Sequence, residues 1–108
     1  MSKFTLADLA DRVHERAKAS AKDSYTGTLI ERGVAYCAKK LGEEAIETAM
    51  AAVQEDKGRL VAEAADLIYH LLVLLEARGV SLGEVEAELE KRTAQSGHEE
   101  KASRTSRN

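Results

Sequence analysis

Two long stretches of helix-forming residues, 28–54 and 57–78, are separated by a short segment that favours a turn. Both stretches are rich in alanine, leucine, glutamate and lysine, and the 108-residue chain contains no proline that would interrupt them. The segment Gln-Glu-Asp-Lys-Gly-Arg at 54–59 is polar and contains a glycine, which is typical of a chain reversal. The sequence therefore predicts two helices that fold back on each other as an antiparallel hairpin.

Further helices are predicted on both sides of this hairpin, over 5–22 and 82–93. Each begins with a hydroxyl residue, Thr5 or Ser81, that is followed three positions later by an acidic residue, as in a capping box. The residues 23–27 break the apolar periodicity and are expected to form a loop. Because no long alternating run of β-branched residues occurs, the expected fold class is all-α: a helical bundle of about four helices around the central hairpin.

The hairpin helices also contain internal signals. Asp56 is expected to cap the helix over 57–78, and Gly79 to end it in a left-handed conformation. Gly33 and Gly42 weaken the stretch 28–54 locally, so that a bend can form near either residue.

The second half of the 57–78 helix, Leu-Ile-Tyr-His-Leu-Leu-Val-Leu-Leu, is apolar on nearly every side. One partner helix cannot cover such a surface, so this helix is either central in a bundle or packed against a second subunit. Since the chain has few helices with which to surround it, we expect an obligate oligomer. A helical domain is predicted over 1–93. The polar residues 94–108 lack large apolar side chains and are expected to form a disordered tail.

Composition excludes several classes of function. The net charge of −3 gives no broad basic surface, which argues against general nucleic-acid binding. No apolar run approaches the length needed to span a membrane, and no apolar signal core is found at the N-terminus. The single cysteine, Cys37, lies in an apolar stretch and is expected to be a reduced, buried thiol. A soluble cytoplasmic protein is expected.

Two acidic clusters lie on the hairpin helices, one before the turn and one after it. Glu44 and Glu47 are three positions apart and share a helix face, as do Glu63 and Asp66, while Glu43 adjoins the first pair. The hairpin would bring these carboxylates to one groove. Carboxylates gathered in one groove repel each other unless a cation lies between them. A cluster of oxygen ligands is suited to a hard divalent cation such as Mg²⁺ or Mn²⁺.

The clusters have two other interpretations. Glutamate-rich helices often present a merely solvated face, but Asp66 lies within an otherwise apolar helix, where aspartate is unfavourable without a partner. A ferritin-type di-iron site would use Glu-x-x-His pairs, and the chain has none. Oxygen-only ligation therefore favours magnesium chemistry on a phosphate substrate.

Groups that could bind phosphate lie near both clusters. Lys39 and Lys40 precede the first cluster by about a turn, and Lys57 and Arg59 precede the second. Each of these cations is equally well explained as an ordinary solvated charge. Two residues of the expected loop, Tyr25 and Thr26, can hydrogen-bond phosphate or stack on a base, and His70 is either an outer-sphere partner of Asp66 or a core histidine.

These motifs resemble the phosphoribosyl-ATP pyrophosphatase family, within the larger MazG-like group of all-α nucleotide pyrophosphohydrolases. The group is marked by Glu-Glu-x-x-Glu followed at a limited interval by Glu-x-x-Asp, which the chain carries at 43–47 and 63–66. The histidine-pathway branch is indicated by Asp-Ser-Tyr-Thr at 23–26 and by Asp-Leu-Ile-Tyr-His-Leu-Leu at 66–72. The resemblance covers about residues 4–92.

The resemblance implies Mg²⁺-dependent hydrolysis of phosphoribosyl-ATP to phosphoribosyl-AMP and pyrophosphate, the second step of histidine biosynthesis. It implies Glu44, Glu47, Glu63 and Asp66 as metal ligands. With Glu44 and Glu47, it makes Glu43 a candidate catalytic residue that acts as an outer-sphere group or positions water. It also implies a homodimer or a dimer of dimers. Many relatives carry a second catalytic domain, for which this chain is too short, so we expect it to act alone.

Two other functions use the same features. A house-cleaning pyrophosphatase for ordinary or non-canonical nucleoside triphosphates would have the same metal site, because the carboxylates act on the shared triphosphate. A non-enzymatic helical dimerisation module would leave the acidic face solvated. It would not bind Mg²⁺ in the physiological range.

Overall fold

The structure is a computed structural model that describes residues 3–94 of the chain. The described residues form five α-helices and no strand, which confirms the all-α prediction. The helices are α1 (Leu6–Ala17), α2 (Tyr25–Arg32), α3 (Val34–Val53), α4 (Lys57–Ala77) and α5 (Leu82–Thr93). No helix in this part of the chain is long and apolar enough to cross a membrane.

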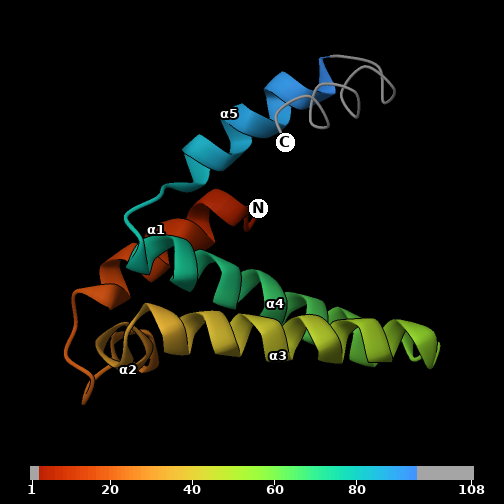
Figure 1. Cartoon of the computed structure of the whole chain (residues 1–108), viewed down its shortest axis with the longest axis horizontal. Coiled ribbons are helices and arrows are strands. Elements are labelled where there is room, and N and C mark those ends of the chain that lie inside the picture. Colours follow the sequence, from red (N-terminus) through yellow and green to blue (C-terminus); the bar gives the residue numbers. More distant parts are fainter. Residues whose placement is uncertain (1–2, 95–108) are drawn as a thin grey trace.

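The predicted hairpin is confirmed as α3 and α4, which run side by side in opposite directions (Figure 1). Only residues 54–56 connect them, and Glu55 takes a positive φ of 60° in this turn. The Asp56 carboxylate accepts the Arg59 N–H at 3.0 Å and so caps α4 as predicted. Gly79 has a φ of +70°, which fits its predicted role just beyond the end of α4.

The predicted helix over 5–22 is too long at its C-terminal end, because α1 stops at Ala17. Beyond that point, local polar contacts replace the helical ladder. The Ser20 hydroxyl donates to the Asp23 carboxylate at 3.0 Å, and the Thr28 hydroxyl donates to the Ala21 carbonyl at 2.9 Å. Side chains that bond nearby backbone groups compete with helix formation in this way. The capping boxes predicted at Thr5 and Ser81 are both present.

The stretch predicted as one helix over 28–54 is two helices, which was the larger error in the expected fold. Gly33 separates α2 from α3 with φ 98° and ψ 171°, a conformation that glycine adopts far more readily than other residues. Figure 1 shows α2 nearly end-on while α3 crosses the view, so the chain turns sharply here. Ser24 caps α2, so Tyr25 and Thr26 lie in its first helical turn and not in the expected loop.

The core lies at the end of the hairpin away from its turn, where α1 and α2 pack against α3 and α4. Five buried side chains from four helices form its centre: Val13, Leu29, Cys37, Leu72 and Val73. The second half of α4 is therefore covered within the chain by α1, α2 and α3, with Leu71 left exposed. This finding removes the reason for which that segment was expected to need a second subunit.

The last helix, α5, contributes no buried residue to this core. In Figure 1 it leads away from the hairpin beyond the end of α4. The predicted disordered tail begins at Ala94, which caps α5, and otherwise lies outside the described residues.

Candidate active site

Three of the predicted metal ligands meet between the two hairpin helices. Glu44 lies on the side of α3 that faces α4, and Glu63 and Asp66 lie one turn apart on α4. Each offers a carboxylate oxygen, and these oxygens all lie within 4.8 Å of one another. The three residues, named here the carboxylate trio, form the only group of three or more acidic, histidine or cysteine ligands at such spacing in the described part of the chain.

The carboxylate trio suits a small hard cation. With Mg²⁺–oxygen distances of 2.0–2.1 Å, ligands on opposite sides of one ion are about 4.2 Å apart, so small side-chain movements would close the trio around it. Burial of the Glu44 carboxyl group, and then the charges of Asp66 and Glu63, raise its pKa above the ordinary value. A divalent cation at this position would offset the repulsion that raises the pKa.

The fourth predicted ligand, Glu47, is held apart from the carboxylate trio by Arg59. The Arg59 guanidinium lies 3.1 Å from the Glu47 carboxylate and 3.9 Å from that of Glu63. It also donates to the Gln54 side chain in the turn. Arg59 therefore bridges the two acidic clusters at the border of the site, with Glu47 one helical turn beyond Glu44 towards the hairpin turn.

The other predicted phosphate-binding cations differ in their positions. Lys40 lies 3.4 Å from the Glu43 carboxylate, and this contact, with smaller contributions that include Tyr25, raises the pKa of Lys40. Lys39 is exposed on α3. Lys57 lines a small hollow of about 170 Å³ at the hairpin turn, so the structure gives it no direct role beside the carboxylate trio.

His70 lies directly behind the carboxylate trio, with a side chain that is only 6% exposed. Its Nδ1 is 2.8 Å from the main-chain oxygen of Asp66, which can only accept, so Nδ1 carries a proton. Nε2 is the one buried side-chain N or O atom among the described residues without a hydrogen-bond partner. His70 therefore binds the main chain of Asp66. The structure shows no hydrogen bond from His70 to the Asp66 carboxylate, which the outer-sphere role would require.

The Ser24-Tyr25-Thr26 segment joins α2 to both α1 and α4. The Ser24 hydroxyl accepts the Gly27 N–H at 3.0 Å and donates to the Arg16 carbonyl at 3.1 Å. Thr26 is buried, and its hydroxyl shares a hydrogen bond of 2.5 Å with the Tyr69 hydroxyl. Ser24 and Thr26 are thus structural residues that fix the position of Tyr25 between them.

Tyr25 is 57% exposed, and its ring is roughly parallel to the ring of Tyr69, with centroids 6.3 Å apart. It meets the His70 ring edge-on at 6.4 Å. Tyr69 and Arg16, which lies beside Tyr69, were not singled out as functional by sequence reasoning. The Tyr-His pair at 69–70 could have indicated Tyr69 from the sequence. Arg16 has no such motif, because it lies in a helix with other charged residues. Its position beside Tyr69 follows only from the packing of α2 against α1.

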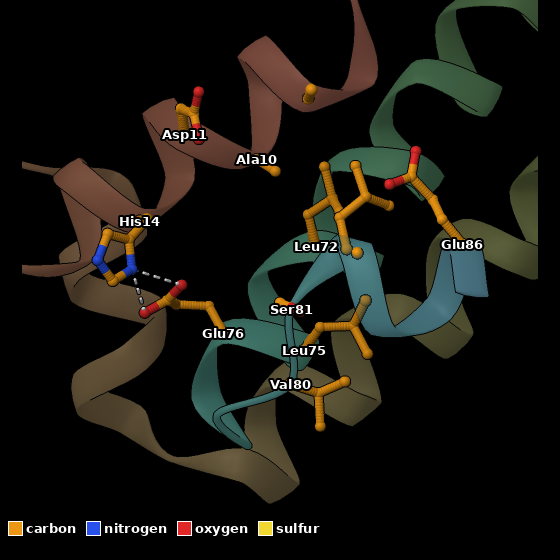
Figure 2. Close-up of a pocket in the computed structure, with 12 residues that line it drawn as sticks. Ala10, Asp11, His14, Leu72, Leu75, Glu76, Val80, Ser81 and Glu86 are labelled. Carbon is orange, nitrogen blue, oxygen red and sulfur yellow. Dashed lines mark hydrogen bonds and ion pairs between the residues drawn. The ribbon is translucent and has the colours of Figure 1, made fainter. Parts of the chain in front are cut away.

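A separate hollow of about 290 Å³ lies where α1, the end of α4 and the start of α5 meet (Figure 2). His14 reaches from α1 to Glu76 on α4, with Nδ1 3.1 Å from the carboxylate oxygens. The rest of the lining is mostly apolar, with Ser81 and two further acidic residues, Asp11 and Glu86. No member of the carboxylate trio lines it, and its acidic lining is unsuited to a phosphate.

Comparisons with known proteins agree with this geometry. A family model described as phosphoribosyl-ATP pyrophosphohydrolase matches residues 6–93. The chain is 58% identical over 104 residues to phosphoribosyl-ATP pyrophosphatase 1 of Bradyrhizobium diazoefficiens, covering 96% of this chain and 98% of that protein. It is 61% identical over 102 residues to the phosphoribosyl-ATP pyrophosphatase of Azorhizobium caulinodans, covering 94% of each. The enzyme of that name from Methylobacterium nodulans is 60% identical over 104 residues, with 96% and 97% covered.

Proposed function

Because the chain belongs to the phosphoribosyl-ATP pyrophosphohydrolase family, we propose that it hydrolyses phosphoribosyl-ATP in histidine biosynthesis. Water cleaves the anhydride between the α- and β-phosphates, and the products are phosphoribosyl-AMP and pyrophosphate. The observation that carries this proposal is the carboxylate trio, which sits on the two helices that bear the acidic motifs. Similarity over nearly the full length of the relatives, with both motifs present, supports the same activity in this chain.

The metal we propose is Mg²⁺, with Mn²⁺ as a substitute. Glu44, Glu63 and Asp66 would hold it, and Glu47 would supply a fourth carboxylate from the next turn of α3. When bound, the ion supplies Lewis-acid stabilisation of the charge on the phosphates. The donor set supports this choice, since hard oxygen ligands without histidine or thiolate favour magnesium and manganese.

The protein's own residues bind and orient the substrate around that centre. Arg59 borders the carboxylate trio and carries a planar group that can donate two hydrogen bonds to one phosphate, so we assign it to the leaving pyrophosphate. Lys40, held by Glu43, is placed near Tyr25 and would bind a neighbouring phosphate. Glu43 is then a positioning residue for Lys40, while Glu44 and Glu47 act at the reacting phosphates. Lys39 and Lys57 would contribute through longer-range attraction.

We further propose that the protein is a homodimer or a dimer of dimers. Ile46, Met50 and Val53 follow each other along the side of α3 that faces away from α4, and their exposures are 66, 49 and 81%. A second copy that packs its own hairpin there would bury this apolar surface and complete a four-helix arrangement.

The cytoplasm is the compartment we propose for this activity. Cys37 is a free thiol, fully buried, and its hydrogen is donated to the Leu29 carbonyl at 3.2 Å. A protein with one unpaired, packed thiol is suited to a reducing compartment.

Side-by-side assays of pyrophosphate release test the proposed substrate. Purified protein with Mg²⁺ would be given phosphoribosyl-ATP, ATP and a panel of other nucleoside triphosphates, and the products identified chromatographically. We expect phosphoribosyl-ATP to be hydrolysed to phosphoribosyl-AMP with the highest kcat/KM. Faster hydrolysis of a non-canonical triphosphate would assign the chain to nucleotide-pool cleansing, and no hydrolysis of any substrate would contradict enzymatic function.

A further inference from the structure

A hollow of about 670 Å³ is lined by two of the predicted substrate-binding residues, Tyr25 and Thr26, but by none of the predicted metal ligands. Its walls are the end of α1, the loop between α1 and α2, the first turn of α2, and Tyr69 of α4. This volume lies within the usual range for small-molecule sites. We name it the α1–α2 hollow.

Among the residues that the structure describes, Arg16 is the only cationic one that lines the α1–α2 hollow. None of the ion pairs in the described part of the chain involves its guanidinium, whereas Arg59, Lys40 and Lys18 are all engaged with carboxylates. The two acidic residues in the lining have other contacts: Glu15 is 3.5 Å from Lys18, and Asp23 accepts from Ser20 at 3.0 Å. Arg16 is therefore free to receive an anion.

Two tyrosines connect the lining of the α1–α2 hollow to residues beside the carboxylate trio. Tyr69 lines the hollow and follows Asp66 by three residues on α4, so the two side chains share a face. Tyr25 also lines the hollow, and its ring contacts His70, which bonds the Asp66 backbone. A molecule with its triphosphate at the trio can thus pass over Tyr25 and extend into the hollow.

We propose that the α1–α2 hollow binds the phosphoribosyl group that distinguishes the substrate from ATP, with Arg16 as the ligand of its phosphate. The proposal rests on the proposed function. A guanidinium matches a phosphate in charge and geometry and can bind it with paired hydrogen bonds. The exposed ring of Tyr25, between the two phosphate sites, provides a flat surface on which the adenine stacks. Arg16 then determines specificity without taking part in bond cleavage.

The test compares kinetic constants of the wild type with those of Arg16→Gln, Arg16→Lys and the matched control Arg12→Gln. Arg12 lies one turn earlier on α1, with its guanidinium over the Phe4 ring and outside the hollow. The fold should survive in R16Q, because Ser24 bonds the Arg16 main-chain carbonyl and not its side chain. Circular dichroism would verify this.

We expect R16Q to raise KM for phosphoribosyl-ATP roughly tenfold to a hundredfold while kcat changes little, as for a contact equally strong in ground and transition states. R16K should recover part of the loss, and R12Q should match the wild type. In competition assays, the wild type should bind phosphoribosyl-AMP more tightly than AMP, and R16Q should bind the two nearly equally.

An unchanged KM in R16Q, a loss confined to kcat, or an equal rise in R12Q would overturn the role of Arg16. These outcomes are distinct from failure of the proposed function, in which the wild type itself would not hydrolyse phosphoribosyl-ATP.

Discussion

Glu44 combines a partly buried carboxyl group with two carboxylates close by. Its carboxyl group lies between α3 and α4 with Glu63 and Asp66 close by, and burial, followed by these charges, raises its pKa. In the absence of metal, the ionised form therefore opposes folding at neutral pH. Such an arrangement is costly for the fold and is best explained by what it binds.

Replacement of Glu44 by glutamine tests this cost. A group with a raised folded-state pKa stabilises the fold while it is protonated, and that stability is lost as the pH rises through the folded-state pKa. Without metal, we expect E44Q to melt a few degrees above the wild type at about pH 8 and at nearly the same temperature at about pH 4. Adding Mg²⁺ should raise the melting temperature of the wild type much more than that of E44Q.

The matched control for this scan is Glu90→Gln on the exposed face of α5, which should follow the wild type at both pH values. If metal-free E44Q melts below the wild type at alkaline pH, the carboxylate is stabilising and our explanation of the trio is wrong.

At the residue scale, the acidic spacing predicted the meeting of Glu44, Glu63 and Asp66, because helix periodicity and a short turn leave few alternatives. Spacing could not predict that Arg59 holds Glu47 aside, since that depends on side-chain conformations across the turn. Arg16 was missed for a similar reason: its role depends on how α2 packs, which no local pattern records.

At the element scale, the short helix α2 is held closely against the end of α1. A Cβ atom on Gly27 would lie 2.6 Å from the Ala19 carbonyl oxygen and 3.0 Å from that of Ser20, both of them backbone atoms. Thr28 adds a hydrogen bond to Ala21 in the same loop. Glycine is required here by the close approach of two backbones, and that approach places Tyr25 beside the α1–α2 hollow.

Gly27→Ala should therefore destabilise the protein by about 1–3 kcal/mol, because backbone atoms must shift to admit the methyl group. Gly83→Ala is the control, since a Cβ there meets only the Ser81 hydroxyl oxygen at 3.7 Å and alanine favours the helix. Urea unfolding followed by circular dichroism measures both. Equal stability of G27A and the wild type would show that α2 is not packed as described.

Helix starts were predicted well from sequence at the side-chain caps Thr5, Asp56 and Ser81, whereas the cap at Ser24 was missed. The division at Gly33 was not predicted, because the residues on both sides keep a helical pattern and glycine only permits a turn without requiring one. What forces the turn is tertiary packing: Leu29 of α2 and Cys37 of α3 must both reach the same core.

At the scale of the whole molecule, the hairpin extends well beyond the core that α1 and α2 complete (Figure 1). Four exposed large apolar side chains lie on this extension: Ile46, Met50, Val53 and Val61. An oligomer was expected from the sequence because the second half of α4 is apolar on nearly every side. In the structure, however, other helices of the same chain cover most of that surface. The evidence for an oligomer is instead the exposed apolar side of α3 that faces away from α4. That side can be identified only when the packing of each helix is known.

Changing Ile46 and Met50 together to aspartate should produce a folded monomer. Both side chains face away from α4, so the charges do not enter the core, but they would be buried in the proposed interface and weaken association at least roughly a hundredfold. Light scattering after size exclusion gives the mass. Leu89→Asp on α5, also at an exposed apolar position, should remain oligomeric. A monomeric wild type would contradict the proposed assembly.

The most direct measurement of the central claim is pyrophosphate release from phosphoribosyl-ATP while Mg²⁺ is titrated, for the wild type, E63Q, D66N and the control E90Q. We expect turnover in the wild type and in E90Q to rise with Mg²⁺ and saturate. E63Q and D66N should remain folded but lose at least roughly a hundredfold in turnover at any Mg²⁺ concentration, because each lacks one ligand of the carboxylate trio. Turnover that is independent of Mg²⁺, or that stays within a few-fold of the wild type in both variants, would contradict a metal-dependent hydrolase built on these carboxylates.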